Sequence, residues 1–240
     1  ITESKKFFLG KGKLFKKNIV KEYEKMISKK IKLKKKLKIV IDCGNGTASP
    51  FAPKIFSKIG CKVEKLFCKS DPNFPNHFPD PTIPEFLQEL IKKVIEKKAD
   101  AGIALDGDSD RIGVIDDKGN ILFGDQLLIL FSRELAAKHK NPKIIVEVKC
   151  SMSLIDEIEK LGGKAIMSAT GHSIIENRMH KEHALLAGEM SGHIYFGDEY
   201  YSFDDAIYAG ARLMRLLALS DKKLSELLVD APKYYNTPEI

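Results

Sequence analysis

Three aspartates alternate with small residues near the middle of the chain and form a candidate metal-binding loop. Asp106, Asp108 and Asp110 are separated by Gly107 and Ser109, and short apolar runs flank this segment on both sides. Apolar runs of this length are typical of buried strands, and alternate side chains of an extended segment share one face. Two carboxylates about 4 Å apart repel by roughly 4 kcal/mol at an effective dielectric near 20. Three of them between two strands indicate a bound cation, and ligands that are all oxygen favour Mg²⁺ over Ca²⁺.

Two neighbouring residues have expected roles in this loop. Gly107 is expected to let the backbone turn inward, so that the three carboxylates converge. Arg111 directly follows the loop, and its guanidinium is suited to bind a phosphate group through two parallel hydrogen bonds.

The acidic loop has three alternative interpretations. A solvated acidic turn is disfavoured by the two flanking strands. A calcium EF-hand loop needs Gly at its sixth position and Glu at its twelfth, where this chain has Arg111 and Asp117. An aspartyl-phosphate phosphatase loop normally continues with Thr or Val, where this chain has Ser109 and Asp110. The phosphatase interpretation stays open on the residues alone.

Polar side chains follow three further predicted strands. They are Lys149, His172, Glu189, Ser191 and His193. In an open α/β sheet, ligands bind outside the carboxyl ends of the strands. A carboxylate, a hydroxyl and an imidazole between two glycines, at 188–193, are suited to bind vicinal sugar hydroxyls. The simpler alternatives are helix capping by Ser151 and Ser173 and a partly buried structural histidine at position 172 or 193. Together with the metal loop and its arginine, these residues favour a phosphosugar site.

The elements that must position these residues alternate between strand and helix. Predicted strands cover 37–42, 62–67, the runs on either side of 106–111, 143–148, 164–168, 185–187 and 194–196. Predicted helices cover 16–30, 50–60, 85–98, 124–138, 151–161, 172–182, 204–219 and 221–230. Such alternation predicts an α/β fold with mixed, largely parallel sheets. Because the pattern repeats, we expect two similar three-layer domains, a metal-loop domain at 18–120 and a sugar-binding domain at 121–231.

A proline-rich arch interrupts the first predicted domain at 71–84. Its five prolines restrict the backbone and exclude a helix. Loops this long inside a compact domain are often functional, and an ordered surface arch is the alternative.

Positive charge is concentrated at one end of the chain. The formal net charge is +7 over 240 residues, whereas residues 1–40 alone hold fifteen Lys and three Glu. The excess is therefore local and the rest of the chain is net negative. This lysine-rich end lacks the signature of a nucleic-acid-binding fold, so we expect a solvated linker and helix face. An anion-binding scaffold is the alternative.

The cysteines and the hydropathy pattern suggest a cytoplasmic protein. Cys43, Cys61, Cys68 and Cys150 show no C-x-x-C spacing, which favours structural thiols in a reducing compartment. No apolar run approaches the length of a membrane span, and no signal peptide is visible. We therefore expect neither a membrane nor a nucleic acid as a partner.

Two motifs resemble those of a known enzyme family. D-G-D-S-D-R at 106–111 and G-E-M-S-G-H at 188–193 resemble the metal loop and the sugar-binding loop of the α-D-phosphohexomutases, and the bacterial phosphomannomutase/phosphoglucomutase group above all. Further matching segments in the same order lie at 42–46, 73–77, 148–150, 170–173 and 203–205. The resemblance covers about 18–240, which corresponds to the second and third of the family's four domains. It implies that 1–17 and 232–240 are linkers to a first and a fourth domain.

The resemblance also implies roles for individual residues. Asp106, Asp108 and Asp110 would bind Mg²⁺. Arg111 and His193 would be catalytic, with His193 assisting proton transfer near the reacting hydroxyls. The substrate-binding residues would be Lys149, His172, Glu189 and Ser191. Met190 in the sugar-binding loop favours mannose and glucose phosphates over glucosamine phosphates.

The chain departs from the family in two respects. Ser109 stands where the family usually has Gly. The family's phosphoserine loop, T-A-S-H-N-P, belongs to the first domain, and Thr47-Ala48-Ser49-Pro50 imitates it without the His and Asn. Ser49 is therefore not expected to be the nucleophile.

The resemblance implies a Mg²⁺-dependent enzyme that interconverts hexose 1-phosphates and 6-phosphates. The reaction would pass through a phosphoserine and a bisphosphorylated sugar. This chain alone is expected to be inactive, because the phosphoserine domain is outside it. The alternative is a non-catalytic module that binds Mg²⁺ and a phosphosugar, and the sequence does not separate the two because both need the same loops.

Overall fold

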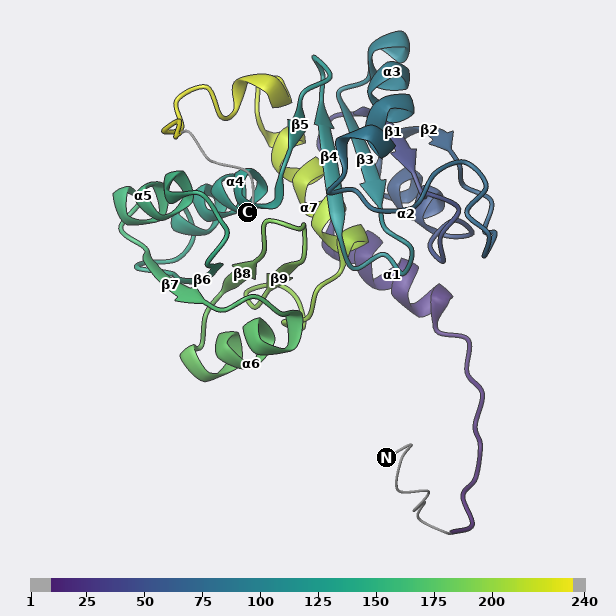
Figure 1. Ribbon diagram of the computed structural model, residues 1–240, viewed down its shortest axis with the longest axis horizontal. Helices are drawn as coiled ribbons and strands as arrows, with labels where there is room; N and C mark the ends of the chain where they lie inside the picture. The colour runs from purple at the N-terminus through teal and green to yellow at the C-terminus, as the bar shows by residue number, and fades with distance from the viewer. Residues whose placement is uncertain (1–9, 235–240) are drawn as a thin grey trace.

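The protein folds around two mixed β-sheets, each covered by helices (Figure 1). The computed structural model describes residues 10–234. This arrangement confirms the α/β fold class with mixed, largely parallel sheets. Among residues 10–234, no helix combines the length and the apolar character that crossing a membrane requires.

The first sheet has the strand order β2-β1-β3-β4-β5. Its strands are β1 (Lys38–Asp42), β2 (Lys62–Leu66), β3 (Ala101–Leu105), β4 (Ile112–Asp116) and β5 (Ile121–Leu122). β1 pairs in parallel with β2 and β3, whereas β4 and β5 are antiparallel. Alternate side chains of each strand point to opposite faces. Val40 and Ala104 therefore contact α3 (Gln88–Lys97), which follows a 3₁₀ turn, η1 (Pro84–Leu87), while Ile39 and Ile103 face the other helices.

The second sheet repeats this topology with the order β7-β6-β8-β9. Its strands are β6 (Lys143–Glu147), β7 (Lys164–Ser168), β8 (Leu186–Gly188) and β9 (Ile194–Phe196). Helix α6 (His172–Glu182) covers one face, and α4 (Gly124–Ala136) and α5 (Met152–Lys160) cover the other. In both sheets the third strand runs through a short loop into an antiparallel fourth strand. The loops 106–111 and 189–193 thus occupy equivalent positions.

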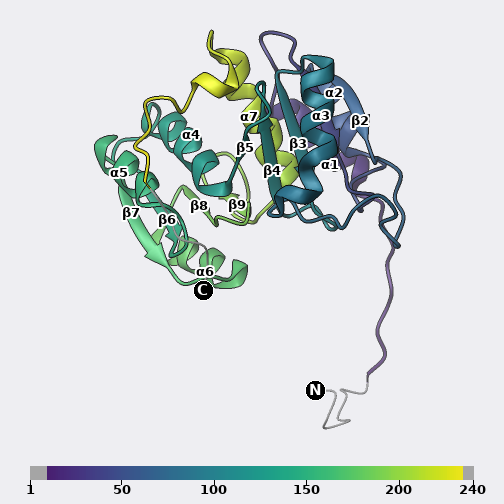
Figure 2. The same ribbon diagram turned by 45° about the horizontal axis from the view of Figure 1, so that its top comes forward.

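One apolar cluster joins the two sheets. It includes side chains of α1 (Val20–Lys30), α2 (Ala52–Ile59), α4 and α7 (Ala206–Leu219). Although α7 follows the second sheet in the sequence, it lies against β3 and β4 of the first (Figures 1 and 2). A Cβ atom at Gly210 would lie 2.9 Å from the ring of Phe56, so the absence of a side chain allows this close approach.

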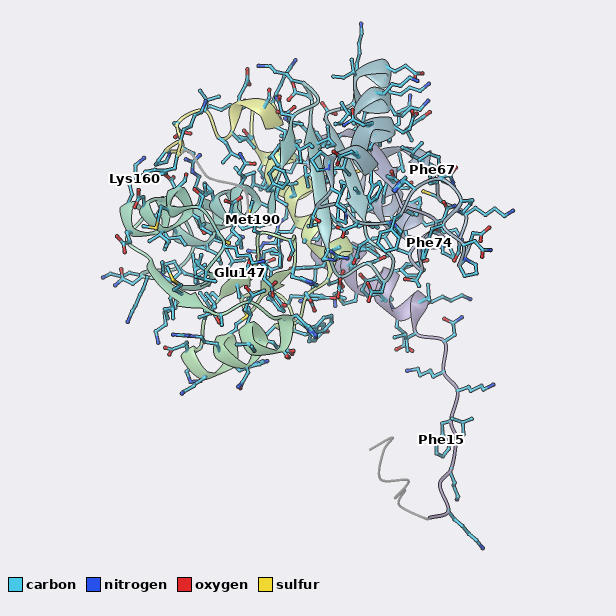
Figure 3. The ribbon with its side chains drawn as sticks, viewed as in Figure 1. Phe15, Phe67, Phe74, Glu147, Lys160 and Met190 are labelled. Carbon is cyan, nitrogen blue, oxygen red and sulfur yellow. The ribbon has the colours of Figure 1, made fainter. Side chains whose placement is uncertain are left out.

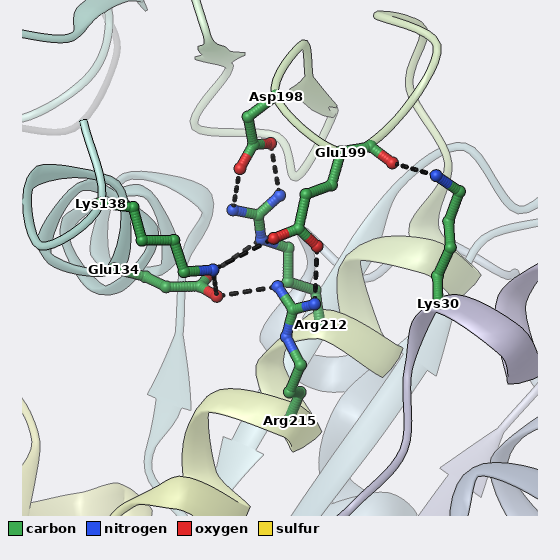
Figure 4. A network of polar contacts seen from close by, with 7 residues as sticks. All are labelled: Lys30, Glu134, Lys138, Asp198, Glu199, Arg212 and Arg215. Carbon is green, nitrogen blue, oxygen red and sulfur yellow. Dashed lines mark hydrogen bonds and ion pairs between the residues drawn. The ribbon is translucent and has the colours of Figure 1, made fainter.

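A set of ion pairs centred on a buried arginine joins two helices and a loop (Figure 4). The fully buried Arg212 of α7 binds Asp198 through two hydrogen bonds of 2.6 and 2.7 Å and binds Glu134 of α4 at 2.8 Å. Arg215, one turn later, contacts both Glu134 and Glu199. Lys138 binds the same two glutamates. We call these six residues the Arg212 network, and it holds α4, α7 and the loop after β9 together.

The predicted helix at 221–230 is wrong. Only a single 3₁₀ turn, η2 (Leu224–Glu226), forms there. Side chains from elsewhere occupy backbone groups that a helix would pair: the Ser225 N–H donates to Asp117, and the Leu227 carbonyl accepts from Arg133. Pro232 further disfavours helical backbone at the residue before it.

Candidate active site

The metal loop connects β3 to β4 and brings its three aspartates together. One carboxylate oxygen from each of Asp106, Asp108 and Asp110 lies within 4.8 Å of the others. Asp106 is 1% exposed, whereas Asp108 is exposed and Asp110 is half-buried. Burial raises the pKa of Asp106, although the Arg111 backbone N–H lowers it, and the nearby Asp110 raises it further. The loop therefore concentrates negative charge that nearby positive charge would stabilise.

The turn that makes this possible occurs at Ser109 and not at Gly107. Ser109 has φ +71°, in the left-handed region, and its carbonyl accepts a hydrogen bond from Ala206 at the start of α7. Gly107 is absent from the residues with positive φ among those described. The residue with left-handed backbone in this loop is therefore Ser109 and not Gly107. Left-handed backbone costs a serine more than a glycine.

Arg111 is oriented by two carboxylates. Its Nε donates to Asp106 at 2.9 Å, and its Nη1 donates to Asp80 of the proline-rich arch at 3.2 Å. Burial would raise the pKa of Asp80, but hydrogen bonds from Thr82 and the charge of Arg111 bring it below its ordinary value. The guanidinium therefore has a fixed plane beside the metal loop.

The arch has a second attachment. His77 Nε2 lies 3.0 Å from the buried Asp42 carboxylate at the end of β1. This contact raises the pKa of His77, against the opposing effect of burial. The arch is thus an ordered part of the site's border.

The sugar-binding loop contains a buried carboxylate with an unused acceptor. Glu189 is 4% exposed, and its Oε1 has no hydrogen-bond partner within the described part of the chain. Its Oε2 accepts a long hydrogen bond of 3.4 Å from Ser191. Burial raises the pKa of Glu189, while His193 lowers it. A buried acceptor without a partner is costly unless a ligand supplies a donor.

The two equivalent loops are joined through their backbones. Arg111 and His193 form an isolated antiparallel bridge, and the Ile112 N–H donates to the Gly192 carbonyl at 3.2 Å. Gly192 has φ +99°, and a Cβ atom there would lie 2.3 Å from the Ile112 carbonyl oxygen. Only glycine fits this contact, so the loop sequence itself specifies how closely the two sheets approach.

His193 lies between Asp110 of the metal loop and Asp204, which precedes α7. Its Nδ1 lies 2.8 Å from Asp204 and 3.7 Å from Asp110. Burial lowers the pKa of His193, but Asp204 and then Asp110 raise it above the ordinary value. Because an ionised carboxylate only accepts, Nδ1 carries the proton and Nε2 remains available for a ligand. One oxygen or nitrogen from each of Asp110, His193 and Asp204 also lies within 4.8 Å of the others.

The remaining predicted site residues lie around this centre. His172, the exposed first residue of α6, stacks on His193 with ring centroids 6.2 Å apart. Lys149, which follows β6, is exposed and lines a pocket of about 820 Å³ together with Met190. The structure thus brings the predicted residues of the metal loop into contact with His193. It places Lys149 on the side of the sugar-binding loop that Met190 faces.

Three positioning residues were missed in the sequence. Glu147 ends β6, is 2% exposed and accepts hydrogen bonds from Thr170 at 2.6 Å and the Met190 N–H at 2.9 Å (Figure 3). Asp204 orients His193, and Asp80 orients Arg111. Glu147 could have been identified as a charged residue that ends an apolar strand. No local pattern indicates that Asp204 binds His193 or that Asp80 binds Arg111.

Ser49 is 5% exposed and belongs to the turn that precedes α2. Its buried hydroxyl is consistent with the expectation that it is not the nucleophile.

Comparisons with known protein families agree over nearly the whole chain. Residues 18–119 match the model described as phosphoglucomutase/phosphomannomutase, alpha/beta/alpha domain II. Residues 123–235 match the model for domain III of the same proteins.

Individual relatives give the same result. A phosphomannomutase/phosphoglucomutase of Pseudomonas putida is 46% identical over 97% of this chain and 50% of its own length. A phosphoglucomutase of Neisseria meningitidis is 45% identical over 95% of this chain and 50% of its own length. The crystal structure of a phosphoglucomutase/phosphomannomutase family protein from Burkholderia thailandensis has a TM-score of 0.89 at 42% identity, covering 92% of this chain and 48% of that one. The chain spans about half the length of these relatives.

Proposed function

The chain belongs to the phosphoglucomutase/phosphomannomutase family, and from this premise we propose that it forms the metal-binding and sugar-binding half of a phosphohexomutase. The whole enzyme interconverts the 1-phosphate and 6-phosphate of mannose or glucose in the cytoplasm. A phosphoserine outside this chain donates the phosphoryl group, and the bisphosphorylated sugar turns over and returns the other one. The half-length match to the relatives supports a division of the site between this chain and further domains.

Mg²⁺ fits the metal loop. The three aspartates offer only oxygen ligands, one from each within 4.8 Å of the others, and hard divalent cations prefer such ligands. The raised pKa of Asp106 indicates that nearby positive charge would favour its ionised form. When bound, Mg²⁺ would neutralise charge on the transferring phosphoryl group.

The side chains of this chain bind and orient the sugar phosphate. Glu189 Oε1 accepts a hydrogen bond from one sugar hydroxyl, and Ser191 contacts its neighbour. The guanidinium of Arg111, which Asp106 and Asp80 orient, contacts the phosphate. The exposed Lys149 and His172 contribute further contacts to the substrate.

His193 is the group that moves a proton. Asp204 holds the Nδ1 proton, so that Nε2 can accept the proton of the attacking hydroxyl and later return it. Burial lowers the pKa of His193, but Asp204 and Asp110 raise it above its ordinary value, which makes Nε2 a stronger proton acceptor.

The observation that carries this proposal is the backbone bridge between Arg111 and His193. It sets Arg111, His193 and the metal loop side by side. The test is chemical-shift mapping of the isotope-labelled chain with Mg²⁺ and glucose 1-phosphate or mannose 1-phosphate. We expect shifts at 106–111 and 188–193. Shifts confined to the lysine-rich segment 29–38 would contradict the proposal and favour an anion-binding surface.

The alternative function is a non-catalytic module that binds Mg²⁺ and a phosphosugar. The match to only half the length of the relatives supports this alternative. The chain alone is expected to show background turnover of glucose 1-phosphate with Mg²⁺ and glucose 1,6-bisphosphate present. Fusing the first and fourth domains should restore activity if the mutase proposal holds, whereas the module predicts no activity in either form. Turnover by the 240-residue chain that Ser49→Ala abolishes would contradict both.

A further inference from the structure

Two cysteines meet at the carboxyl ends of adjacent strands in the first sheet. Cys43 directly follows β1, and Cys68 lies two residues beyond β2. Their sulfur atoms are 3.2 Å apart. Cys61 and Cys150 are buried, and neither has another cysteine at hydrogen-bond distance among the described residues. The contact is therefore specific to one pair.

We propose that Cys43 and Cys68 are a redox modification site, at which peroxide converts the two thiols into a reversible intramolecular disulfide. The parallel register pairs Asp42 with Leu66, so neighbouring turns carry the two cysteines. The Cys43 N–H donates to the Leu66 carbonyl, and the Asn45 N–H donates to the Phe67 carbonyl. These bonds keep the two turns together, and the sulfurs need only a small movement to reach bonding distance.

The two sulfurs differ in access, which sets the order of events. Cys68 is partly exposed, whereas Cys43 is fully buried. The contact with the Cys43 thiol lowers the pKa of Cys68, against the opposing effect of burial. Peroxide therefore meets Cys68 first, and Cys43 acts as the resolving thiol.

Peroxide is the only reactant that this oxidation needs besides the two thiols. The Cys68 thiolate attacks one peroxide oxygen, the O–O bond breaks, and a sulfenic acid and hydroxide form. The Cys43 sulfur then displaces the sulfenic hydroxyl group, so that an S–S bond forms and the Cys43 proton leaves with the hydroxyl as water. The two thiols lose two electrons, peroxide is reduced to water, and a dithiol reductant reverses the change.

The disulfide would link the end of β2, at the edge of the sheet, to the turn after β1 that contacts the metal loop. Asp42 accepts from the Gly44 N–H and contacts His77 of the arch. A few residues on, the Thr47 N–H donates to the Gly107 carbonyl at 2.9 Å. Cys43 thus belongs to a turn that contacts both the arch and the metal loop. Phe67, the residue before Cys68, marks this edge of the molecule in Figure 3.

The test uses the folded 240-residue chain. The reduced protein is treated with hydrogen peroxide, its remaining thiols are alkylated, and intact mass and peptide mapping follow. We expect the loss of two of the four thiols, the loss of the mass of two hydrogen atoms before alkylation, a cross-linked peptide pair containing Cys43 and Cys68, and full recovery with dithiothreitol.

Variants separate the roles of the two sulfurs. Cys68→Ser, at a partly exposed position, should keep its three remaining thiols. Cys43→Ala should stop at a sulfenic acid on Cys68 that dimedone traps. Cys150→Ser is the matched control and should lose two thiols as the wild type does. Retention of all four thiols in the folded wild type, or a cross-link involving Cys61 or Cys150, would overturn the proposal. Since Cys43→Ala alters a buried position, Cys68→Ser decides the outcome if that variant does not fold.

Discussion

The metal loop and the Arg212 network both gather several charged side chains, but they balance charge in different ways. In the network, Glu134, Asp198 and Glu199 face Arg212, Arg215 and Lys138, and every carboxylate has a basic partner at hydrogen-bond distance (Figure 4). In the metal loop, three aspartates converge, and Arg111 contacts only Asp106 among them.

The pKa values show the consequence of this difference. Burial would raise the pKa of Glu199, but hydrogen bonds from Arg215 and Lys138 lower it to about 2. Burial raises the pKa of Asp106, and the single arginine does not reverse the effect. A balanced cluster stabilises the folded chain, whereas an unbalanced one is suited to bind a ligand.

Asp198→Ala should destabilise the fold by about 3 kcal/mol, because it leaves the fully buried Arg212 with fewer partners. Urea unfolding monitored by circular dichroism measures the change. The matched control is Asp221→Ala, an exposed aspartate, which should change stability by less than about 0.5 kcal/mol. Equal effects of the two variants would mean that the network contributes nothing specific.

Mg²⁺ should stabilise the wild type, since it supplies the positive charge that the metal loop lacks. At about 100 times its dissociation constant, a ligand contributes roughly 2.7 kcal/mol. Thermal melts with and without Mg²⁺ should show an upward shift in the wild type and in Asp221→Asn, and none in Asp108→Asn. The absence of a shift in the wild type, or an undiminished shift in Asp108→Asn, would contradict the metal assignment.

Acid should weaken the Arg212 network through Glu199. Its pKa falls from 4.5 in the unfolded chain to about 2 in the fold, so its contribution is present above 4.5 and is lost as the pH falls toward 2. Since the Glu199 side chain is 32% exposed, we expect a contribution of about 1 kcal/mol. Unfolding measured from pH 5 to pH 2 should show a smaller acid-dependent loss in Glu199→Gln than in the wild type. Parallel pH curves would argue against this role.

The candidate active site should show the opposite dependence through His193. Its pKa is raised in the fold, so its contribution is complete below the unfolded value and is lost as the pH rises through the folded value. Asp204→Asn should lower the pKa of His193 and reduce stability at low pH by about 0.5–1 kcal/mol, the usual value of one hydrogen bond. NMR titration of the His193 ring measures the pKa, and the exposed His180 serves as the internal reference. An unchanged His193 titration would show that Asp204 does not orient it.

Ser109→Gly should stabilise the chain by less than about 1 kcal/mol, because glycine adopts φ +71° without steric cost. Thermal unfolding without Mg²⁺ is the measurement. Ser28→Gly, inside α1, is the matched control and should destabilise by a similar amount, because glycine is unfavourable within a helix. A loss of stability in Ser109→Gly would mean that the side chain makes a contact worth more than the backbone strain.

The sequence predicted the regular elements because their signals are local. The apolar runs at 101–105 and 112–116 predicted the strands beside the metal loop. The prediction at 221–230 was wrong because Asp117 and Arg133, distant in sequence, bind its backbone. Local periodicity carries no information about such partners.

The site was predicted in part for the same reason. The carboxylates at 106–110 and the polar residues at 188–193 could be located from strand ends. The bridge between Arg111 and His193 depends on how two sheets approach, and Asp80 and Asp204 reach their partners across the fold. Ser109 illustrates a further limit, because the residue type gave no indication of its left-handed backbone.

The position of α7 has a consequence for the synthesis of the chain on the ribosome. The strand ending at Asp116 and the ring of Phe56 face a surface that Gly210 and its neighbours cover. About a hundred residues separate Ile112 from Gly210. At typical translation rates of about 5–20 residues per second, this face therefore stays uncovered for roughly 5–20 s. Ribosome-bound chains that stop short of α7 should therefore expose an apolar surface and recruit chaperones, although every strand of the first sheet has already been made.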